Sequence, residues 1–312
     1  MTDEVKDNVT EPVTPVNRKN GTVAIIARFA GFWAVFALIL GLLSLIYSSN
    51  KDPNIYDSFT SFVKERELRN VEDESLQVLF MGDSECYSSF HPKCFSEAGI
   101  SSFNLGTSAQ KICDSYVILK DTLEKQSPDV VILETNLLFH DQKKDSTSGD
   151  IVLNKLNSEI PVFKFHSDWK ILVGELVPFV MDKVHDTNNG FIVRETVIPY
   201  EGGPHMNYTP ETLHLKDSVC EYLEMINDMC LENDIKFILV SSPSAINYDY
   251  TKHNGIAEWA DANGVEYLDL NLIDEIGIDW STDTKDAGDH INLSGAIKVS
   301  NYLAGYVKQY ID

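Results

Sequence analysis

The chain of 312 residues carries little positive charge. Its 25 lysines and arginines stand against 48 aspartates and glutamates, which leaves a formal net charge of −23 at pH 7. A surface this acidic repels polynucleotides and anionic membranes, so nucleic-acid binding is excluded as a function class. We expect the excess acids to form a solvated surface, and we expect no nucleic-acid partner.

Cysteines are few and irregularly spaced. They are Cys86, Cys94, Cys113, Cys220 and Cys230. An odd number at such spacings makes a poor disulfide framework, and no Cys-x-x-Cys pair with a matching histidine suggests zinc. Cys220 and Cys230 fall in one predicted helix, roughly 15 Å apart at 1.5 Å per residue, which is too far to bridge. We therefore expect buried thiols, with a Cys86–Cys94 disulfide as the less favoured alternative.

The sequence also lacks a glycine-rich phosphate loop, a metal-ligand cluster and an internal repeat. These absences give no reason to expect a cofactor or a metal ion. The chain is 43% hydrophobic, which is enough for one large domain, or two small ones, with a substantial core.

Charge is absent altogether from one stretch, FAGFWAVFALILGLLSLIY at Phe29–Tyr47. Extended back to Val23, it is long enough for a bilayer core, which needs about 20 residues, and Arg28 can snorkel to the headgroups. A buried core helix would show a polar face, and a cleavable signal peptide would have a shorter apolar region and a small-residue cleavage site. The stretch has neither feature, so we predict a retained transmembrane helix over residues 23–47.

The segments that flank this helix are polar. Residues 1–22 predict a disordered tail, and residues 48–75 predict a juxtamembrane helix or linker. Arg18, Lys19 and Arg28 lie on the N-terminal side of the apolar stretch. Because positive charge favours the cytoplasmic side, we expect the tail in the cytoplasm and the main domain outside the cell membrane.

From residue 76 to 312, short apolar runs alternate with helical stretches. The predicted strands are Gln77–Met81, Ser102–Leu105, Asp129–Thr135, Lys236–Val240 and Val265–Leu268. The predicted helices lie near Ser108–Lys125, Pro210–Asn233, Lys252–Asn263 and Leu293–Gln309. This alternation predicts an α/β domain with a mostly parallel sheet and helices on both faces. Residues 140–210 interrupt it and predict an insertion over one sheet edge, which either shapes a substrate groove or only covers the edge.

The first predicted strand ends in Gly82-Asp83-Ser84. These residues are common turn formers, but the serine is also placed to be a nucleophile, which needs a base to remove its proton. His290 precedes the last predicted helix, so it can lean over the carboxyl edge of the sheet where Ser84 emerges. The imidazole in turn needs a carboxylate on its other nitrogen. The aspartates within reach along the chain are Asp283, Asp286 and Asp289.

Two other predicted strands end in residues that can donate hydrogen bonds to an oxyanion. Gly106 follows the second strand and offers its backbone N–H, and Asn136 follows the third and offers its side-chain amide. With the N–H of Ser84 itself, they make three candidate donors for the charge that develops in acyl transfer. Asp83 is predicted to orient the loop through backbone amides.

This ordered set of residues resembles the SGNH (GDSL-like) hydrolase family, over about residues 77–312. The resemblance implies a three-layer α/β/α sandwich. It also implies that Ser84 is the nucleophile and His290 the base, and that Gly106 and Asn136 are oxyanion donors.

The last block of the family is Asp-x-x-His, but Ala287 stands at the aspartate position here. Asp289 adjoins His290, so its side chain would diverge from the imidazole. Asp286 is followed by Ala287 and Gly288, a loop that can fold it back. We therefore predict Asp286 as the orienting acid, with Asp289 as the alternative.

The third block also departs from the family's Gly-x-Asn-Asp, since it reads Glu134-Thr135-Asn136-Leu137. Two further stretches lie near the predicted site. FHSDWK, with His166 and Trp169, offers a stacking surface or a second imidazole, although a packed aromatic is favoured. SSPSAINYDY, from Ser241, reaches the same edge of the sheet and either lines the pocket or forms a turn.

The anchored layout is similar to outward-facing SGNH proteins that edit bacterial envelope polymers, including O-acetyltransferases and esterases of surface polysaccharides. The resemblance thus implies an extracytoplasmic serine esterase or O-acyltransferase that acts on acyl esters of a cell-envelope glycan. It also implies a partner membrane protein that delivers the acyl group. The alternative is a non-catalytic envelope assembly or binding protein on the same scaffold.

Overall fold

The computed structural model describes residues 18–49, 64, 67–68, 70–140 and 188–311. The chain divides into two compact units, Met1–Ser49 and Asn50–Asp312. The first unit holds helix α1 (Arg18–Ser49). Its window Ile26–Leu43 has a mean hydropathy of 2.1, and none of this window is buried. By length and composition α1 can cross a membrane, and it begins earlier than the predicted span of residues 23–47.

The second unit is built on a five-stranded sheet in which every pair of neighbours is parallel. In spatial order the strands are β2 (Ser102–Asn104), β1 (Val78–Met81), β3 (Val130–Glu134), β4 (Lys236–Ser241) and β5 (Glu266–Asp269). The predicted strands agree with these bounds to within one residue at each end. All five strands end at the same edge of the sheet, and this edge carries the candidate site.

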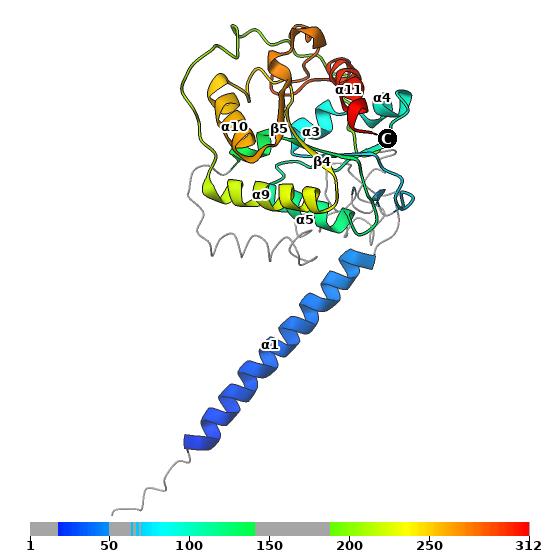
Figure 1. The fold of residues 1–312 in the computed structure, drawn as a ribbon. Helices are drawn as coiled ribbons and strands as arrows, with labels where there is room; N and C mark the ends of the chain where they lie inside the picture. The colour runs from blue at the N-terminus through cyan, green and yellow to red at the C-terminus, as the bar shows by residue number, and fades with distance from the viewer. Residues whose placement is uncertain (1–17, 50–63, 65–66, 69, 141–187, 312) are drawn as a thin grey trace, which may run out of the picture. The chain divides into compact units, whose positions relative to one another are not determined.

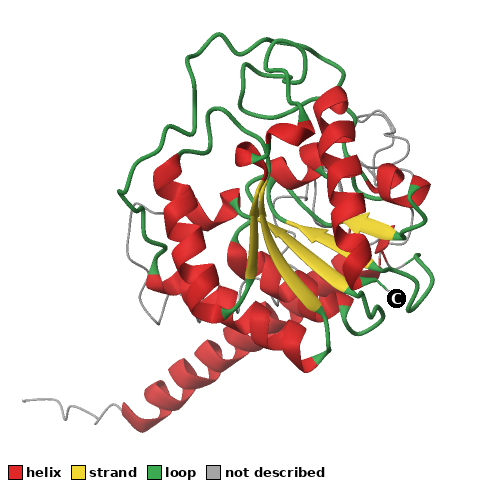
Figure 2. Cartoon of the chain, turned by 45° about the horizontal axis from the view of Figure 1, so that its top comes forward, coloured by secondary structure: helices red, strands yellow, loops and turns green. Residues whose placement is uncertain are grey.

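The helices of this unit form two layers. They are α3 (Ser84–Ser89), α4 (Pro92–Glu97), α5 (Ile112–Thr122), α9 (Asp217–Glu232), α10 (Tyr250–Asn263) and α11 (Leu293–Val307). Leu79 and Met81 of β1 pack in one core with α5, α9 and α10, whereas Val78 and Phe80 pack in the other with α3, α4 and α11. Burial on both faces explains why the strands are continuous apolar runs. The fold is thus the predicted three-layer α/β/α sandwich (Figures 1 and 2).

The helices differ from the prediction mainly at their N-terminal ends. Residues 210–216 are not helical, and α9 begins at Asp217. The prediction also lacks α3 and α4, because helices of six residues are too short to show a helical repeat in the sequence. Short 3-10 helices complete the set: η1 (Asn136–Phe139), η3 (Leu270–Leu272), η4 (Asp274–Ile276) and η5 (Lys308–Tyr310).

Part of the predicted insertion at 140–210 is described, from residue 188 onward. This part contains neither helix nor strand. At its start the backbone oxygen of Asn189 accepts an N–H from edge strand β2. Farther along, the N–H of Ile198 donates to the oxygen of Thr284, and the oxygen of Ile198 accepts from Ala287. The segment therefore reaches from the edge of the sheet to the loop before α11.

All five cysteines are free thiols. Cys220 is partly buried and the other four are buried, as expected for thiols in an apolar interior. The alternative Cys86–Cys94 disulfide is not formed.

Candidate active site

Ser84 lies at the carboxyl end of β1, where the chain turns from the strand into α3. Gly82 makes the turn with a φ of +151°, and a Cβ atom there would lie 2.7 Å from the Cβ atoms of Cys86 and Glu134. Glycine therefore fits where a larger residue would displace its neighbours. Asp83 caps the helix, since its Oδ1 accepts a backbone N–H of the first turn at 2.9 Å. Ser84 is thus the first helical residue.

His290 comes to Ser84 from the far end of the chain. Its Nε2 lies 2.8 Å from the Oγ of Ser84. The histidine sits in the loop before α11, whose N-cap Asn292 accepts from the N–H groups of Ser294 and Gly295. Only 14% of the His290 side chain is exposed, so the pair is partly shielded from water. The structure brings together the nucleophile and the base that the sequence predicts.

Asp286 lies on the other side of the imidazole. Its Oδ2 is 2.8 Å from Nδ1 of His290, and its Oδ1 accepts the backbone N–H of His290 at 2.6 Å. Ala287 and Gly288 have positive φ angles of 59° and 95°, which fold the chain back. Thr284 closes this turn, since its Oγ1 accepts from the N–H of Gly288 at 2.7 Å and donates to the oxygen of His290 at 3.0 Å. Hydroxyl, imidazole and carboxylate thus have the geometry of a catalytic triad.

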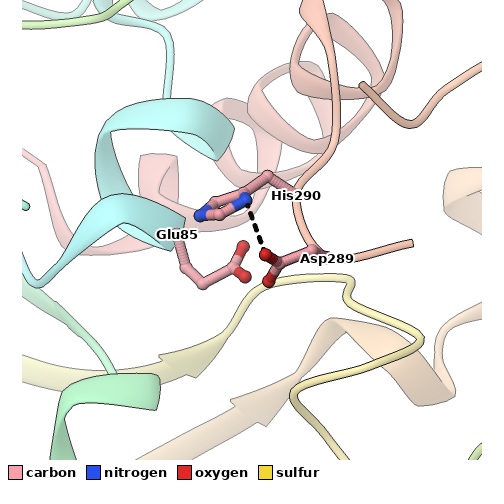
Figure 3. Close-up of side chains that lie close together, drawn as sticks. All are labelled: Glu85, Asp289 and His290. Carbon is pink, nitrogen blue, oxygen red and sulfur yellow. Dashed lines mark ion pairs between the residues drawn. The ribbon is translucent and has the colours of Figure 1, made fainter. Parts of the chain in front are cut away.

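The two other candidate aspartates have different partners. Oδ2 of Asp289 lies 3.5 Å from Nδ1 of His290, and its Oδ1 accepts from Nδ2 of Asn247 at 2.6 Å. Figure 3 shows its carboxyl group facing that of Glu85 beneath the imidazole. Asp283 is buried and forms an ion pair of 2.5 Å with a lysine of α11, so it holds the helix rather than the histidine.

The candidate oxyanion donors differ from the prediction at one position. The N–H of Gly106 donates to Oδ1 of Asn104 at 3.0 Å, so the predicted role of Gly106 does not fit this arrangement. Asn136 donates from Nδ2 to Oδ2 of Asp83 at 2.8 Å, which uses one of its two amide hydrogens. Ser84 is the first residue of α3, and its backbone N–H has no acceptor within the described part of the chain. The donors left for an oxyanion are the Ser84 N–H and the second Asn136 hydrogen.

The loop after β2 is held from the interior by Lys64. This side chain is fully buried. Its Nζ donates to the backbone oxygens of Gly106 and Gly190 and lies 5.1 Å from the centre of the Tyr87 ring. Burial lowers the pKa of Lys64 to about 7. The amine satisfies two carbonyl groups here without a carboxylate partner in hydrogen-bond contact among the described residues.

A second imidazole is present, but not the one that the sequence suggests. His166 and Trp169 lie outside the described residues. His140 instead places its Nε2 2.8 Å from Oδ2 of Asp83 and 3.5 Å from Nδ2 of Asn136. The only sequence signal was that this histidine follows the third strand closely, four residues after the block asparagine.

Two glutamates are fully buried beneath the nucleophile. Burial raises the pKa of Glu85 well above its usual range, and the carboxylates of Glu134 and Asp83 add to the effect. Burial, followed by the Asp83 carboxylate, raises the pKa of Glu134 to about 8. The hydroxyl groups of Tyr248 and Ser242 donate to Glu134 at 2.5 and 3.0 Å, which opposes the shift without cancelling it. Burial therefore favours the protonated form of both glutamates.

One set of residues has the spacing of a metal site. Glu85, Asp289 and His290 each offer a ligand atom within 4.8 Å of the others. Nδ2 of Asn247 lies between the two carboxyl groups, 2.6 Å from each. Both imidazole nitrogens also have partners, Ser84 and the orienting acid. These residues could hold a cation only if the imidazole gave up one of those partners.

The stretch that follows β4 reaches the site, as its position in the sequence predicts. The Oγ of Ser242 donates to buried Glu134. The Oγ of Ser244 donates to the backbone oxygen of Asp289 at 2.6 Å. This loop therefore supports the site from below and fixes the turn that carries the imidazole.

No family model matches the chain, and no curated protein matches its sequence. Several solved structures resemble it. A putative acylhydrolase from Bacteroides fragilis has 14% identity over 78% of this chain and 94% of its own, with a TM-score of 0.40. A GDSL-like lipase from Bacteroides thetaiotaomicron has 12% identity over 82% and 100%, with a TM-score of 0.41. These values are too low to support an activity, which must come from the geometry of the site.

The two acids near the imidazole can be separated by isosteric substitution. We expect Asp286→Asn to lower kcat for p-nitrophenyl acetate by roughly 10²- to 10⁴-fold, because the amide cannot stabilise the imidazolium. Asp289→Asn is the matched control and should change kcat by less than about 5-fold, since an amide oxygen still accepts from Asn247. Steady-state kinetics on the full chain in detergent measure both. The reverse order would transfer the orienting role to Asp289.

Glu134 should make stability depend on pH. Its folded pKa of about 8 lies above the usual 4.5, so the folded state keeps a proton that the unfolded state loses. The stabilisation of the folded state by this proton is complete below pH 4.5, and it is lost as pH rises through 8. We expect Glu134→Gln to gain on wild type by roughly 1 kcal/mol per pH unit between pH 5 and 8.

Denaturant unfolding at three pH values measures the difference in free energy of unfolding between Glu134→Gln and wild type. The result that matters is how this difference changes with pH, and its absolute size is not used. Exposed Glu232→Gln is the control and should run parallel to wild type. Parallel curves for Glu134→Gln as well would show that Glu134 is ionised in the folded protein at neutral pH.

Proposed function

We propose that the chain is a serine-dependent esterase or O-acyltransferase that acts on acyl esters of a cell-envelope glycan. A single observation carries the chemistry. The Ser84 hydroxyl lies 2.8 Å from His290 Nε2, and Nδ1 of the same ring lies 2.8 Å from Asp286. A hydroxyl bonded to a base that is itself oriented by a carboxylate is an activated nucleophile.

In the proposed reaction, the Oγ of Ser84 attacks the ester carbonyl while its proton passes to Nε2 of His290. Asp286 stabilises the imidazolium, and the Ser84 N–H and the Asn136 amide receive the oxyanion. The intermediate collapses when the alcohol leaves with the proton from His290, and an acyl-serine remains. Water or a sugar hydroxyl, deprotonated by the same imidazole, then takes the acyl group. Water gives hydrolysis, and a sugar gives transfer.

The proposed location follows from α1 and from the charges beside it. Arg18, Lys19 and Arg28 lie at the N-terminal side of the apolar window, which favours a cytoplasmic N-terminus. The catalytic unit would then face outward, where envelope glycans are its accessible esters. A transferase of this kind needs an acyl donor, and a membrane protein that delivers acyl groups is the proposed partner.

A non-catalytic envelope assembly or binding protein on the same scaffold is the second candidate. The displaced Asp-x-x-His block favours it, because Ala287 stands at the family's acid position. The hydrogen-bonded Ser84–His290 pair argues for the enzyme. Chemical labelling separates the two.

We expect a fluorophosphonate probe to label the full chain in detergent at Ser84, with loss of fluoride. Ser84→Ala should abolish labelling and lower p-nitrophenyl acetate hydrolysis on the order of 10⁴-fold. Ser101→Ala, before β2 at the opposite end of the strands, should label like wild type. A folded wild-type chain that stays unlabelled under these conditions supports the second candidate, a non-catalytic assembly or binding protein.

Topology has a separate test. We expect protease added to intact cells to degrade the unit from Asn50 to Asp312, while an N-terminal tag ahead of α1 stays protected. Lysed cells, in which both parts should be cleaved, are the control. Protection of the large unit in intact cells would place it in the cytoplasm and remove the envelope substrate from the proposal.

A further inference from the structure

Carboxyl residues flank the nucleophile on both sides, and both of them are fully buried. Asp83 immediately precedes Ser84, and its side chain has no exposed surface. Its two oxygens meet donors: Oδ1 accepts the N–H of Glu85, and Oδ2 accepts from Asn136 and contacts His140. Both oxygens of this carboxyl group therefore have hydrogen-bond partners.

A negative charge on Asp83 would oppose the proposed chemistry. The reaction creates an oxyanion on the carbonyl attached to Ser84, one residue away from Asp83. Like charges in a shielded site repel each other strongly, so an uncompensated Asp83 would raise the barrier. Burial raises the pKa of the neighbouring acids, Glu85 and Glu134, and so reduces their share of this repulsion.

His140 is the imidazole that contacts Asp83. Its Nε2 lies 2.8 Å from Oδ2, and the side chain is 30% exposed, so a proton can reach it from water. The amide of Asn136 donates to the same oxygen at 2.8 Å. Since one oxygen serves both donors, the imidazole also limits where the amide can lie.

The nearest other cation among the described residues has a different partner. Lys252 on α10 lies over the Phe139 ring at 4.9 Å, but its Nζ donates to the backbone oxygen of Asn247 rather than to a carboxylate. Burial lowers the pKa of Lys252, which weakens it as a permanent counter-ion. In the described part of the chain, the other titratable groups that interact with Asp83 are Cys86, Tyr87, Tyr248, Glu85 and Glu134.

We propose that His140 is a positioning residue of the active site, which as an imidazolium neutralises Asp83 beside the developing oxyanion and holds the Asn136 amide in place. This inference rests on the proposed esterase or acyltransferase chemistry. His140 acts through Asp83 and Asn136 and takes no proton from the substrate.

The test separates charge from hydrogen bonding. His140→Gln keeps a donor for Asp83 but removes the charge. We expect kcat for p-nitrophenyl acetate to fall about 10- to 100-fold with KM within about 3-fold of wild type, and fluorophosphonate labelling to slow by the same factor. His253→Gln is the matched control, because His253 forms an equally short pair of 2.8 Å with buried Asp269 on β5. His253→Gln should leave both kcat and the rate of labelling within about 3-fold of wild type.

A double variant excludes a merely structural role. In Asp83→Asn/His140→Gln the carboxylate that needs neutralising is gone, and Asn remains a good N-cap. We expect kcat of the double variant to be at least about 10-fold higher than kcat of His140→Gln. A double variant slower than His140→Gln, or a His140→Gln that labels as fast as wild type, overturns the inference. Wild type that neither labels nor hydrolyses esters overturns the proposed function and this inference with it.

Discussion

The hydrogen bond between Ser84 and His290 joins the start of α3 to the loop before α11, and the rest of the site depends on it. The serine opens α3, and the histidine stands just before α11. These two helices contact each other in the same apolar core, with Cys86 and Ala296 among its buried members. Hydrophobic burial in that one layer therefore sets the distance between nucleophile and base. The parallel sheet contributes the edge at which both segments end.

The site is acidic in composition but far less so in charge. Three carboxyl side chains, Asp83, Glu85 and Glu134, are fully buried at the edge that carries the hydroxyl. Burial raises the pKa of both glutamates, which favours their neutral forms. The third, Asp83, is in contact with His140. In the proposed reaction, the protons on the glutamates and the pairing of Asp83 with His140 would weaken the field that opposes an oxyanion.

Much of this arrangement could be predicted from the sequence because it is local. Strands buried on both faces are apolar throughout, and the Gly288 turn lets Asp286 fold back onto the base. The oxyanion role predicted for Gly106 does not fit the structure, because its N–H donates to the side chain of Asn104. A sequence motif shows that a backbone N–H is available, but it does not show which acceptor lies nearest to that N–H in the fold. The role of His140 was missed for a related reason. Its partner Asp83 lies in a different βα unit, and a single histidine after a strand belongs to no motif that would point to this partner.

The described part of the insertion does more than cover an edge of the sheet. The oxygen of Ile198 accepts the N–H of Ala287 at 2.9 Å, within the turn that carries the orienting acid. From the other side, the N–H of Ala245 donates to the oxygen of Gly288 at 2.9 Å. The turn has two residues in the left-handed region and would be strained if unsupported. Two loops from distant parts of the chain therefore fix the position of Asp286. A change in residues near 198 can alter the orientation of the base without contacting it.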